Sequence, residues 1–208
     1  MFNLASLPST LTRLLPDGGV EMPGVNSPYL YFGMWKATFT WHVEDMDLHS
    51  IKYLHFGAPK FWYAMPQGRA NVFENVMRSE SMLFASLRGW LTGLRIGYFP
   101  RDTSLCPQFL RHRSFLASPN LLADSSVRPL CVVQHAGEFV VTFPRRYHAG
   151  FNLGFNCAEA VNFATECWVE IGLCARACQC INDSVRIGVE ELVKIGRASC
   201  RERVCLYV

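Results

Sequence analysis

The sequence of 208 residues lacks any uninterrupted apolar run of about 20 residues, the length that a membrane-spanning helix needs. Residues 1–18 also lack a basic segment followed by an apolar one, so no secretory signal is predicted. The chain lacks a strong charge of either sign, since 20 basic and 17 acidic residues leave a formal net charge of +3. A charge this small argues neither for nor against nucleic acid. We predict no membrane partner and no direct sequence-specific contact with nucleic acid from this segment.

What the sequence does contain is enough apolar material for one core, since 50% of its residues are hydrophobic. It shows no internal repeat. Nine cysteines and six histidines stand out in a chain without a secretory signal. In a reducing intracellular setting, clustered cysteines indicate a metal site rather than disulfides.

Runs rich in aromatic and β-branched residues, which favour strands, recur along the chain. Helical spacing is confined to 72–77, 83–94 and short pieces within 1–28 and after Ser118, whereas glycine and asparagine predict a turn at 150–156. Many strands, few helices and no βαβ alternation predict a mainly β fold with flanking helices, either an antiparallel barrel or a jelly roll. The predicted strands are 29–32, 38–41, 50–57, 60–64, 130–134, 138–143 and 158–165.

The segment 41–45 (WHVED) carries the first chemical motif. His42 and Glu44 are two residues apart, so on a strand both side chains project from one face. A second histidine would complete a 2-His-1-carboxylate triad, whose open positions suit non-haem Fe(II) with a co-substrate and O₂. His-x-Glu alone is common by chance and often marks only a solvated strand face. His148 supplies the missing candidate from the end of a distant strand.

Four stretches together resemble the JmjC histone lysine demethylases, and most closely the lysine-specific demethylase 4 (JmjN/JmjC) branch. The resemblance covers about 2–194 and implies a double-stranded β-helix, the cupin-like jelly roll, that uses Fe(II), 2-oxoglutarate and O₂. The stretches are YLYFGMWK at 29–36, WHVEDMD at 41–47, YLHFG at 53–57 and HAGFNLGFNCAEAVNFAT at 148–165.

The resemblance also implies an activity. Such enzymes remove methyl groups from methylated lysine, here expected to be trimethyl-lysine on the histone H3 tail, and release formaldehyde, succinate and CO₂ in the nucleus. Two alternatives stay open: a JmjC protein hydroxylase, which shares the iron and 2-oxoglutarate parts, and a catalytically dead chromatin-binding scaffold.

Carried over residue by residue, the resemblance gives as iron ligands His42, Glu44 and His148. Lys60 matches the lysine that pairs with the distal carboxylate of 2-oxoglutarate, for which an ammonium is a suitable point charge. Phe39 matches an aromatic residue that packs on this co-substrate, although a phenylalanine on a strand is more often core. Lys52 stands where the family has an asparagine near the 2-oxoglutarate carboxylate, and its cation could pair with a carboxylate or crowd the site.

A methyl-ammonium pocket is implied as well, in which oxygen atoms and an aromatic ring surround a cation that cannot donate a conventional hydrogen bond. Pro23 replaces an acidic residue beside it. The residues that match the lining of this pocket are Tyr31, Gly24, Ala160 and Asn162.

A second metal is suggested by the cysteines. One imidazole and three thiolates suit a closed tetrahedral Zn²⁺ site, and the demethylase 4 branch has a zinc site of this spacing. We expect the other cysteines Cys131, Cys157, Cys167 and Cys174 to be buried small hydrophobes. The predicted zinc ligands are Cys106, His112, Cys178 and Cys180.

The domain organisation follows from these matches. We expect a leading helix and loop at 1–28 and the JmjC catalytic domain, with its zinc site, at 29–194. Residues 78–98 look like an insertion, either a helical excursion or, as we favour, an unspliced segment. Residues 195–208 (beginning IGRASCRERV) resemble a translated sequencing adaptor. Because the start aligns with the interior of the family's domain, we expect a fragment without JmjN and without the tyrosine that assists Lys60.

Overall fold

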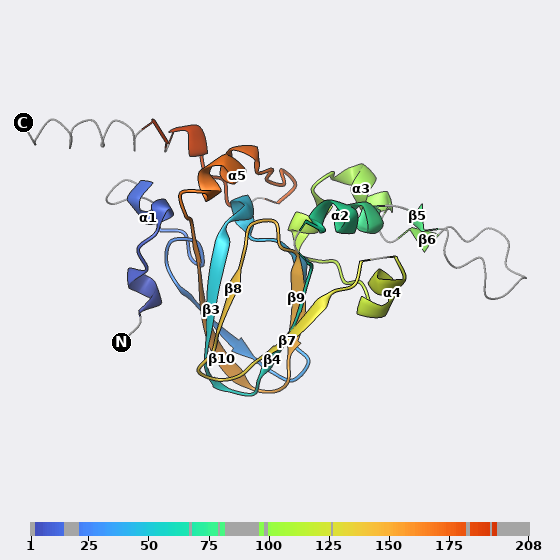
Figure 1. Ribbon diagram of the computed structural model, residues 1–208, viewed down its shortest axis with the longest axis horizontal. Helices are drawn as coiled ribbons and strands as arrows, with labels where there is room; N and C mark the ends of the chain where they lie inside the picture. The colour runs from blue at the N-terminus through green and yellow to red at the C-terminus, as the bar shows by residue number, and fades with distance from the viewer. Residues whose placement is uncertain are drawn as a thin grey trace, which may run out of the picture.

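The computed structural model of the protein is built around two facing β-sheets, with helices at the ends and sides (Figure 1). It describes residues 3–14, 21–66, 68–78, 80–81, 96–97, 100–125, 127–181, 184–191 and 193–194. The expected adaptor tail, the helix predicted at 83–94 and most of the expected insertion lie outside these residues.

Each of the two sheets has four strands, and all neighbouring strands within each sheet are antiparallel. This arrangement confirms the predicted jelly roll. In order across the first sheet lie β1 (Tyr29–Gly33), β10 (Asn156–Phe163), β3 (His49–Gly57) and β8 (Phe139–Thr142). The second contains β2 (Thr38–His42), β9 (His148–Asn152), β4 (Lys60–Ala64) and β7 (Leu130–Gln134), and a separate pair is formed by β5 (Glu80–Ser81) and β6 (Ile96–Gly97).

Short helices flank the barrel, as predicted. In Figure 1, α1 lies on one side, α2, α3 and α4 lie on the other, and α5 covers the end between them. Among the residues that the structure describes, no helix has the length and apolar character to cross a membrane. The helical elements are η1 (Leu4–Ser6), α1 (Thr10–Leu14), η2 (Asp45–Asp47), α2 (Ala70–Arg78), α3 (Pro100–Leu105), η3 (Phe109–His112), α4 (Pro119–Asp124) and α5 (Trp168–Cys174).

The prediction of a turn at 150–156 is wrong at both of its ends, because residues 150–152 belong to β9 and Asn156 begins β10. Gly150 is required there by close packing rather than by a turn. A Cβ atom at this position would lie 2.1 Å from the carbonyl oxygen of Phe61 and 2.4 Å from Cζ of Phe39. The glycine therefore lets the Phe39 ring lie against the strand.

Two apolar cores each include residues from the stretch that runs from the end of β2 to the start of β3. Trp41 and Val43 belong to a core with Phe73 of α2, whereas Met46 and Leu48 belong to the other core. The second core also includes the fully buried Leu11 and Trp168, from α1 and α5. Because His42 and Glu44 alternate with Trp41 and Val43, burial of the apolar pair turns the polar pair into the barrel.

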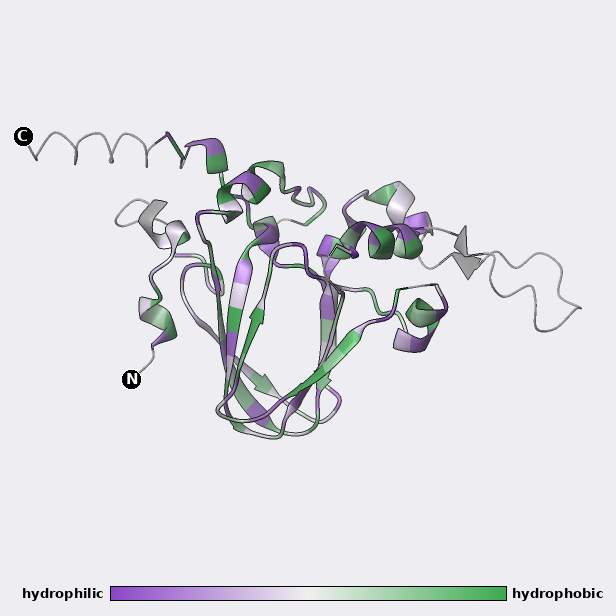
Figure 2. Ribbon diagram, viewed as in Figure 1, coloured by the Kyte–Doolittle hydropathy of each residue, from purple (hydrophilic) through white to green (hydrophobic). Residues whose placement is uncertain are grey.

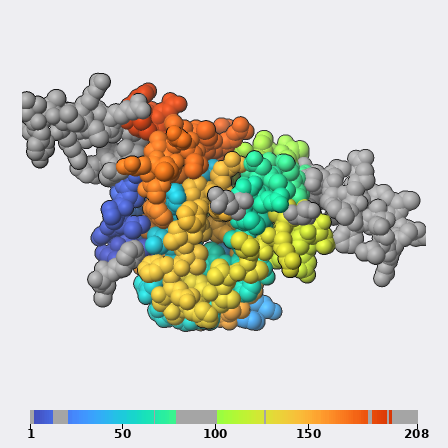
Figure 3. Space-filling view, viewed as in Figure 1, coloured from blue at the N-terminus to red at the C-terminus, as the bar shows by residue number. Residues whose placement is uncertain are grey.

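The inside of the barrel is polar, whereas part of its outside is apolar. The strand β7 is largely apolar in Figure 2, and its Leu130 and Val132 are exposed. Figure 3 shows the yellow part of the chain, which includes β7 and β8, on the surface facing the viewer. The last residue of β7, Gln134, is buried and accepts a hydrogen bond from Trp62 Nε1 at 3.1 Å. Buried polar side chains are hydrogen-bonded or hold ligands. The barrel interior is thus suited to a binding cavity.

Candidate metal centres and their cavity

A cavity of about 440 Å³ occupies the barrel and takes its lining from both sheets. It brings together every residue that the sequence predicted for iron, co-substrate and substrate. These are His42, Glu44, His148, Lys60, Lys52, Phe39, Tyr31, Gly24, Ala160 and Asn162.

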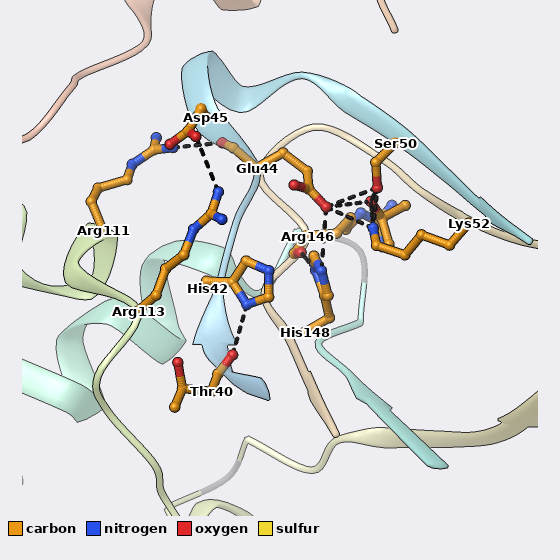
Figure 4. Close-up of polar contacts among 11 residues, drawn as sticks. Thr40, His42, Glu44, Asp45, Ser50, Lys52, Arg111, Arg113, Arg146 and His148 are labelled. Atoms are coloured by element: carbon orange, nitrogen blue, oxygen red, sulfur yellow. Dashed lines mark hydrogen bonds and ion pairs between the residues drawn. The ribbon is translucent and has the colours of Figure 1, made fainter. Parts of the chain in front are cut away.

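The two histidines and the glutamate line this cavity and lie close to one another (Figure 4). His42 on β2 and His148 on β9 are register partners, and their ring centroids are 4.3 Å apart. Glu44 is the second residue after β2, and one ligand atom from each of the three residues lies within 4.8 Å of the others. Three such atoms at this separation can hold one ion and leave positions open.

Both histidines are oriented for ligation by backbone carbonyls. Nδ1 of His42 lies 2.7 Å from the Thr40 oxygen, and Nδ1 of His148 lies 2.9 Å from the Arg146 oxygen. A carbonyl only accepts, so each Nδ1 carries the proton and each Nε2 keeps its lone pair. Nε2 of His148 is buried without a hydrogen bond, 3.4 Å from Oε1 of Glu44. A buried acceptor of this kind fits a metal ligand.

The protonation states fit the same role. Burial, with a smaller effect of His148, lowers the pKa of His42 to about 3, so its ring is neutral. Burial alone would raise the pKa of Glu44, but the Lys52 ammonium and the histidines hold that pKa well below its usual range. Neutral imidazole and ionised carboxylate are the forms that bind a cation.

Lys60, the first residue of β4, places a buried cation in the cavity. Its Nζ donates to Oδ1 of Asn152 at 2.7 Å and lies 5.9 Å from the centre of the Phe39 ring. Burial lowers the pKa of Lys60 to about 8. No carboxylate in the described part of the chain forms an ion pair with it. Since buried charges are normally paired, this ammonium is a site for an anionic ligand.

Lys52 on β3 takes a different position from Lys60. Its Nζ lies 2.7 Å from Oε1 of Glu44 and bonds to Ser50 Oγ (Figure 4). The ammonium also lies 5.7 Å from the centre of the Trp62 ring. Lys52 therefore pairs with a carboxylate of the protein.

The second cluster is formed by η3 and by the segments that follow α3 and α5. Sγ of Cys178 is 3.5 Å from Sγ of Cys106 and 3.1 Å from Nε2 of His112, and Cys180 completes the group within 4.8 Å. Four ligands about 2.3 Å from one Zn²⁺ lie about 3.8 Å apart, so the group fits a tetrahedral ion. Burial and the neighbouring Cys178 raise the pKa of Cys106 to about 11. Burial alone would also raise the pKa of Cys178, but hydrogen bonds from the Cys180 backbone N–H and from the neighbouring thiols together lower it.

Of the cysteines expected to be buried hydrophobes, only Cys157 is buried. Cys131, Cys167 and Cys174 are exposed, so that prediction is wrong for all three. Their positions in the fold explain this exposure. Cys131 lies on the largely exposed β7, whereas Cys167 and Cys174 lie at the two ends of α5.

Sequence reasoning missed several residues that complete the site. Asn152 escaped notice because its segment was predicted as a turn, although it accepts the Lys60 hydrogen bond. Ser50 and Trp62 lie two residues from Lys52 and Lys60, so strand alternation could have identified them. Arg111 carried no such signal. It reaches the Glu44 carbonyl oxygen at 2.7 Å from a distant helical turn.

Comparison with known proteins agrees with this geometry. Residues 29–163 match the family described as "JmjC domain, hydroxylase". The chain belongs to the JmjC family. This JmjC chain is 45% identical to lysine-specific demethylase 4B of Mus musculus and to probable lysine-specific demethylase 4F of Homo sapiens, and 43% identical to lysine-specific demethylase 4D of Rattus norvegicus. Each match covers 93% of the chain but only 16%, 28% and 34%, respectively, of the relative.

Proposed function

We propose that this JmjC chain is the catalytic part of an Fe(II)- and 2-oxoglutarate-dependent dioxygenase that demethylates lysine. Its substrate is methylated, and specifically trimethylated, lysine on the histone H3 tail, and it acts in the nucleus. The observation that carries the proposal is a single cavity that contains His42, Glu44 and His148 together with the buried cation of Lys60. The names of the relatives support lysine demethylation as the reaction.

In this proposal the triad residues hold Fe(II) from one side. When bound, Fe(II) with 2-oxoglutarate supplies the activation of O₂ that oxidises an N-methyl group. The chain positions the reactants and limits access of water. The carbonyls of Thr40 and Arg146 fix the histidine rings, and the cores around Trp41 and Leu48 fix the segment that carries Glu44.

Lys60 binds the distal carboxylate of 2-oxoglutarate. Its ammonium has only the neutral Asn152 amide as a hydrogen-bond acceptor, so a carboxylate supplies the charge that the described residues do not. The Phe39 ring lies against Gly150 and Trp62, where it forms an apolar wall beside the ammonium. This wall suits the methylene groups of the co-substrate.

The trimethyl-ammonium group lies near Tyr31, Gly24, Ala160 and Asn162. Gly24 adopts a φ of +80°, and a Cβ atom there would lie 3.8 Å from the Tyr31 hydroxyl oxygen. Its carbonyl accepts from the Asn162 backbone N–H at 2.9 Å, which ties this loop to β10. Glycine therefore provides space beside an aromatic ring, as a methylated ammonium requires.

A structural Zn²⁺ held by Cys106, His112, Cys178 and Cys180 joins η3 to the segment after α5. Its binding free energy contributes directly to folding. The ion takes no part in the reaction, because all four positions of a tetrahedral site are filled by protein atoms.

Incubation with a trimethyl-lysine histone H3 peptide, Fe(II), 2-oxoglutarate and O₂ tests the proposal. Demethylation predicts formaldehyde and succinate in equal amounts, with loss of methyl groups in the peptide mass spectrum. A His148→Ala variant should produce neither. Succinate without formaldehyde would instead indicate a hydroxylase.

The Lys52–Glu44 ion pair favours a second candidate, a scaffold that binds the methylated tail without turnover. Such a protein would bind the peptide and release neither product. The same assay therefore separates all three functions.

A further inference from the structure

One carboxylate oxygen of Glu44 accepts hydrogen bonds from several side chains on β3 and β8. This oxygen, Oε1, accepts from Lys52 Nζ at 2.7 Å, from Ser50 Oγ at 2.8 Å and from Thr142 Oγ1 at 3.4 Å (Figure 4). A carboxylate oxygen offers two lone pairs, so these donors already use the capacity of Oε1. The same atom faces His148 Nε2, the direction from which an ion held by the triad would approach.

The Lys52 ammonium is fixed in this place. Lys52 pairs with Ala160 on one side and with Val140 on the other, so its backbone is central in the sheet. Its Nζ bonds to Ser50 Oγ, lies 3.4 Å from Thr142 Oγ1 and sits 5.7 Å from the Trp62 ring centre. The side chains of Lys52 and Glu44 are only 16% and 9% exposed. Water therefore screens this charge little.

A fixed ammonium beside a metal ligand opposes the metal in two ways. The ammonium forms an ion pair with the Glu44 carboxylate, and a divalent cation would have to compete with that ion pair for the same carboxylate. The ammonium also repels that cation directly, and in a water-poor cavity this repulsion is much stronger than in bulk solvent. Groups that contact a metal ligand from outside typically change metal affinity about 10–100-fold.

We propose that Lys52 is an internal competitor for Glu44 that weakens the iron site, so that the loaded fraction of the protein depends on metal supply. This inference rests on the iron site of the proposed function. Lys52 does not touch the metal itself but acts through Glu44, and its effect is to lower the affinity of the site for the metal. Its removal should strengthen metal binding, whereas loss of an ordinary supporting contact would weaken it.

The test is an anaerobic titration of the zinc-loaded protein with Mn(II), followed by the electron paramagnetic resonance signal of free Mn(II). Mn(II) suits nitrogen and oxygen ligands and avoids thiolates, so it reports on the triad. Lys52→Asn should lower the dissociation constant about 10–100-fold. Lys52→Met, which keeps an unbranched side chain without the charge, should do the same and guards against a folding defect in the first variant.

Two controls separate charge from packing. Lys52→Arg keeps the cation and should stay within about threefold of the unmodified protein, and so should Lys36→Asn, which removes an exposed lysine. If folded Lys52→Asn and Lys52→Met bind Mn(II) no more tightly than the unmodified protein, the inference is overturned and the iron site stands. If none of these proteins binds Mn(II), the iron site of the proposed function fails and the inference fails with it.

Discussion

Arg111 and Asp47 form an ion pair of 2.6 Å between Nη2 and Oδ1, with side chains that are 10% and 9% exposed. The other guanidinium nitrogen donates to the Glu44 carbonyl oxygen. Between these contacts, Met46 and Asp47 adopt left-handed backbone conformations, with φ of 53° and 52°. Such conformations cost free energy in residues other than glycine. Arg111 thus stabilises the strained turn that follows the metal ligand.

Replacement of Arg111 should therefore be costly. Arg111→Ala leaves the Asp47 carboxylate buried without its partner, so the free energy of unfolding should fall by about 3–5 kcal/mol. Denaturant unfolding followed by fluorescence measures the change. Arg113→Ala is the matched control, because Arg113 pairs with Asp45 but is 46% exposed, and it should cost about 0–1 kcal/mol. Equal losses in the two variants would contradict the role given to Arg111.

His42 should be essential for iron binding. His42→Ala removes one of three donors, so bound iron and 2-oxoglutarate turnover should both be lost. Iron per protein molecule is measured after anaerobic loading and desalting. His55→Ala, which alters a more exposed histidine paired with Glu159, should retain iron. An unchanged iron content in His42→Ala would rule out the triad.

Lys60 should set the affinity for the co-substrate. Lys60→Ala removes the cation that faces a carboxylate in the cavity, a loss of about 2–5 kcal/mol in 2-oxoglutarate binding. Steady-state kinetics with varied 2-oxoglutarate measures this as a rise in KM, and Lys36→Ala serves as the exposed control. A rise of less than about threefold would show that Lys60 does not bind the co-substrate.

Cys178 is central to the zinc prediction, because it contacts both Cys106 and His112. Cys178→Ser should lower the zinc content and the melting temperature, since structural Zn²⁺ adds its binding energy to folding. Metal analysis and thermal unfolding measure the two effects. Cys131→Ser, at an exposed cysteine, should change neither. A stable Cys178→Ser protein with full zinc content would exclude this site.

The sequence predicted the strands best where the same residues favour a strand and also suit the burial that the strand has in the fold. Aromatic and β-branched runs predicted β1 and β4, because such residues suit a strand whether they face the cavity or the outside. The metal ligands were found by their types and spacing. Composition misled at Gly150, where the need is for space beside Phe39 and not for a turn.

The partner of each charged group was harder to predict. Lys52 could have faced the co-substrate or the glutamate, and only its distances to Glu44 and Trp62 distinguish these arrangements. The contacts of Arg111 depend on how η3 lies against the turn after β2. No local pattern encodes that placement, because it results from packing between segments distant in the chain.

The pairing of the earliest strands with the latest ones has a consequence for how the protein folds. β1 has β10 as its sheet neighbour, and β2 has β9, so Tyr29 pairs with Ala160 and His42 with His148. Among the strands that the structure describes, β1 and β2 meet their partners only after β9 and β10 have left the ribosome. Closing such long loops makes folding slow. The complete triad therefore forms only once β9 has joined β2, late in the assembly of the described barrel.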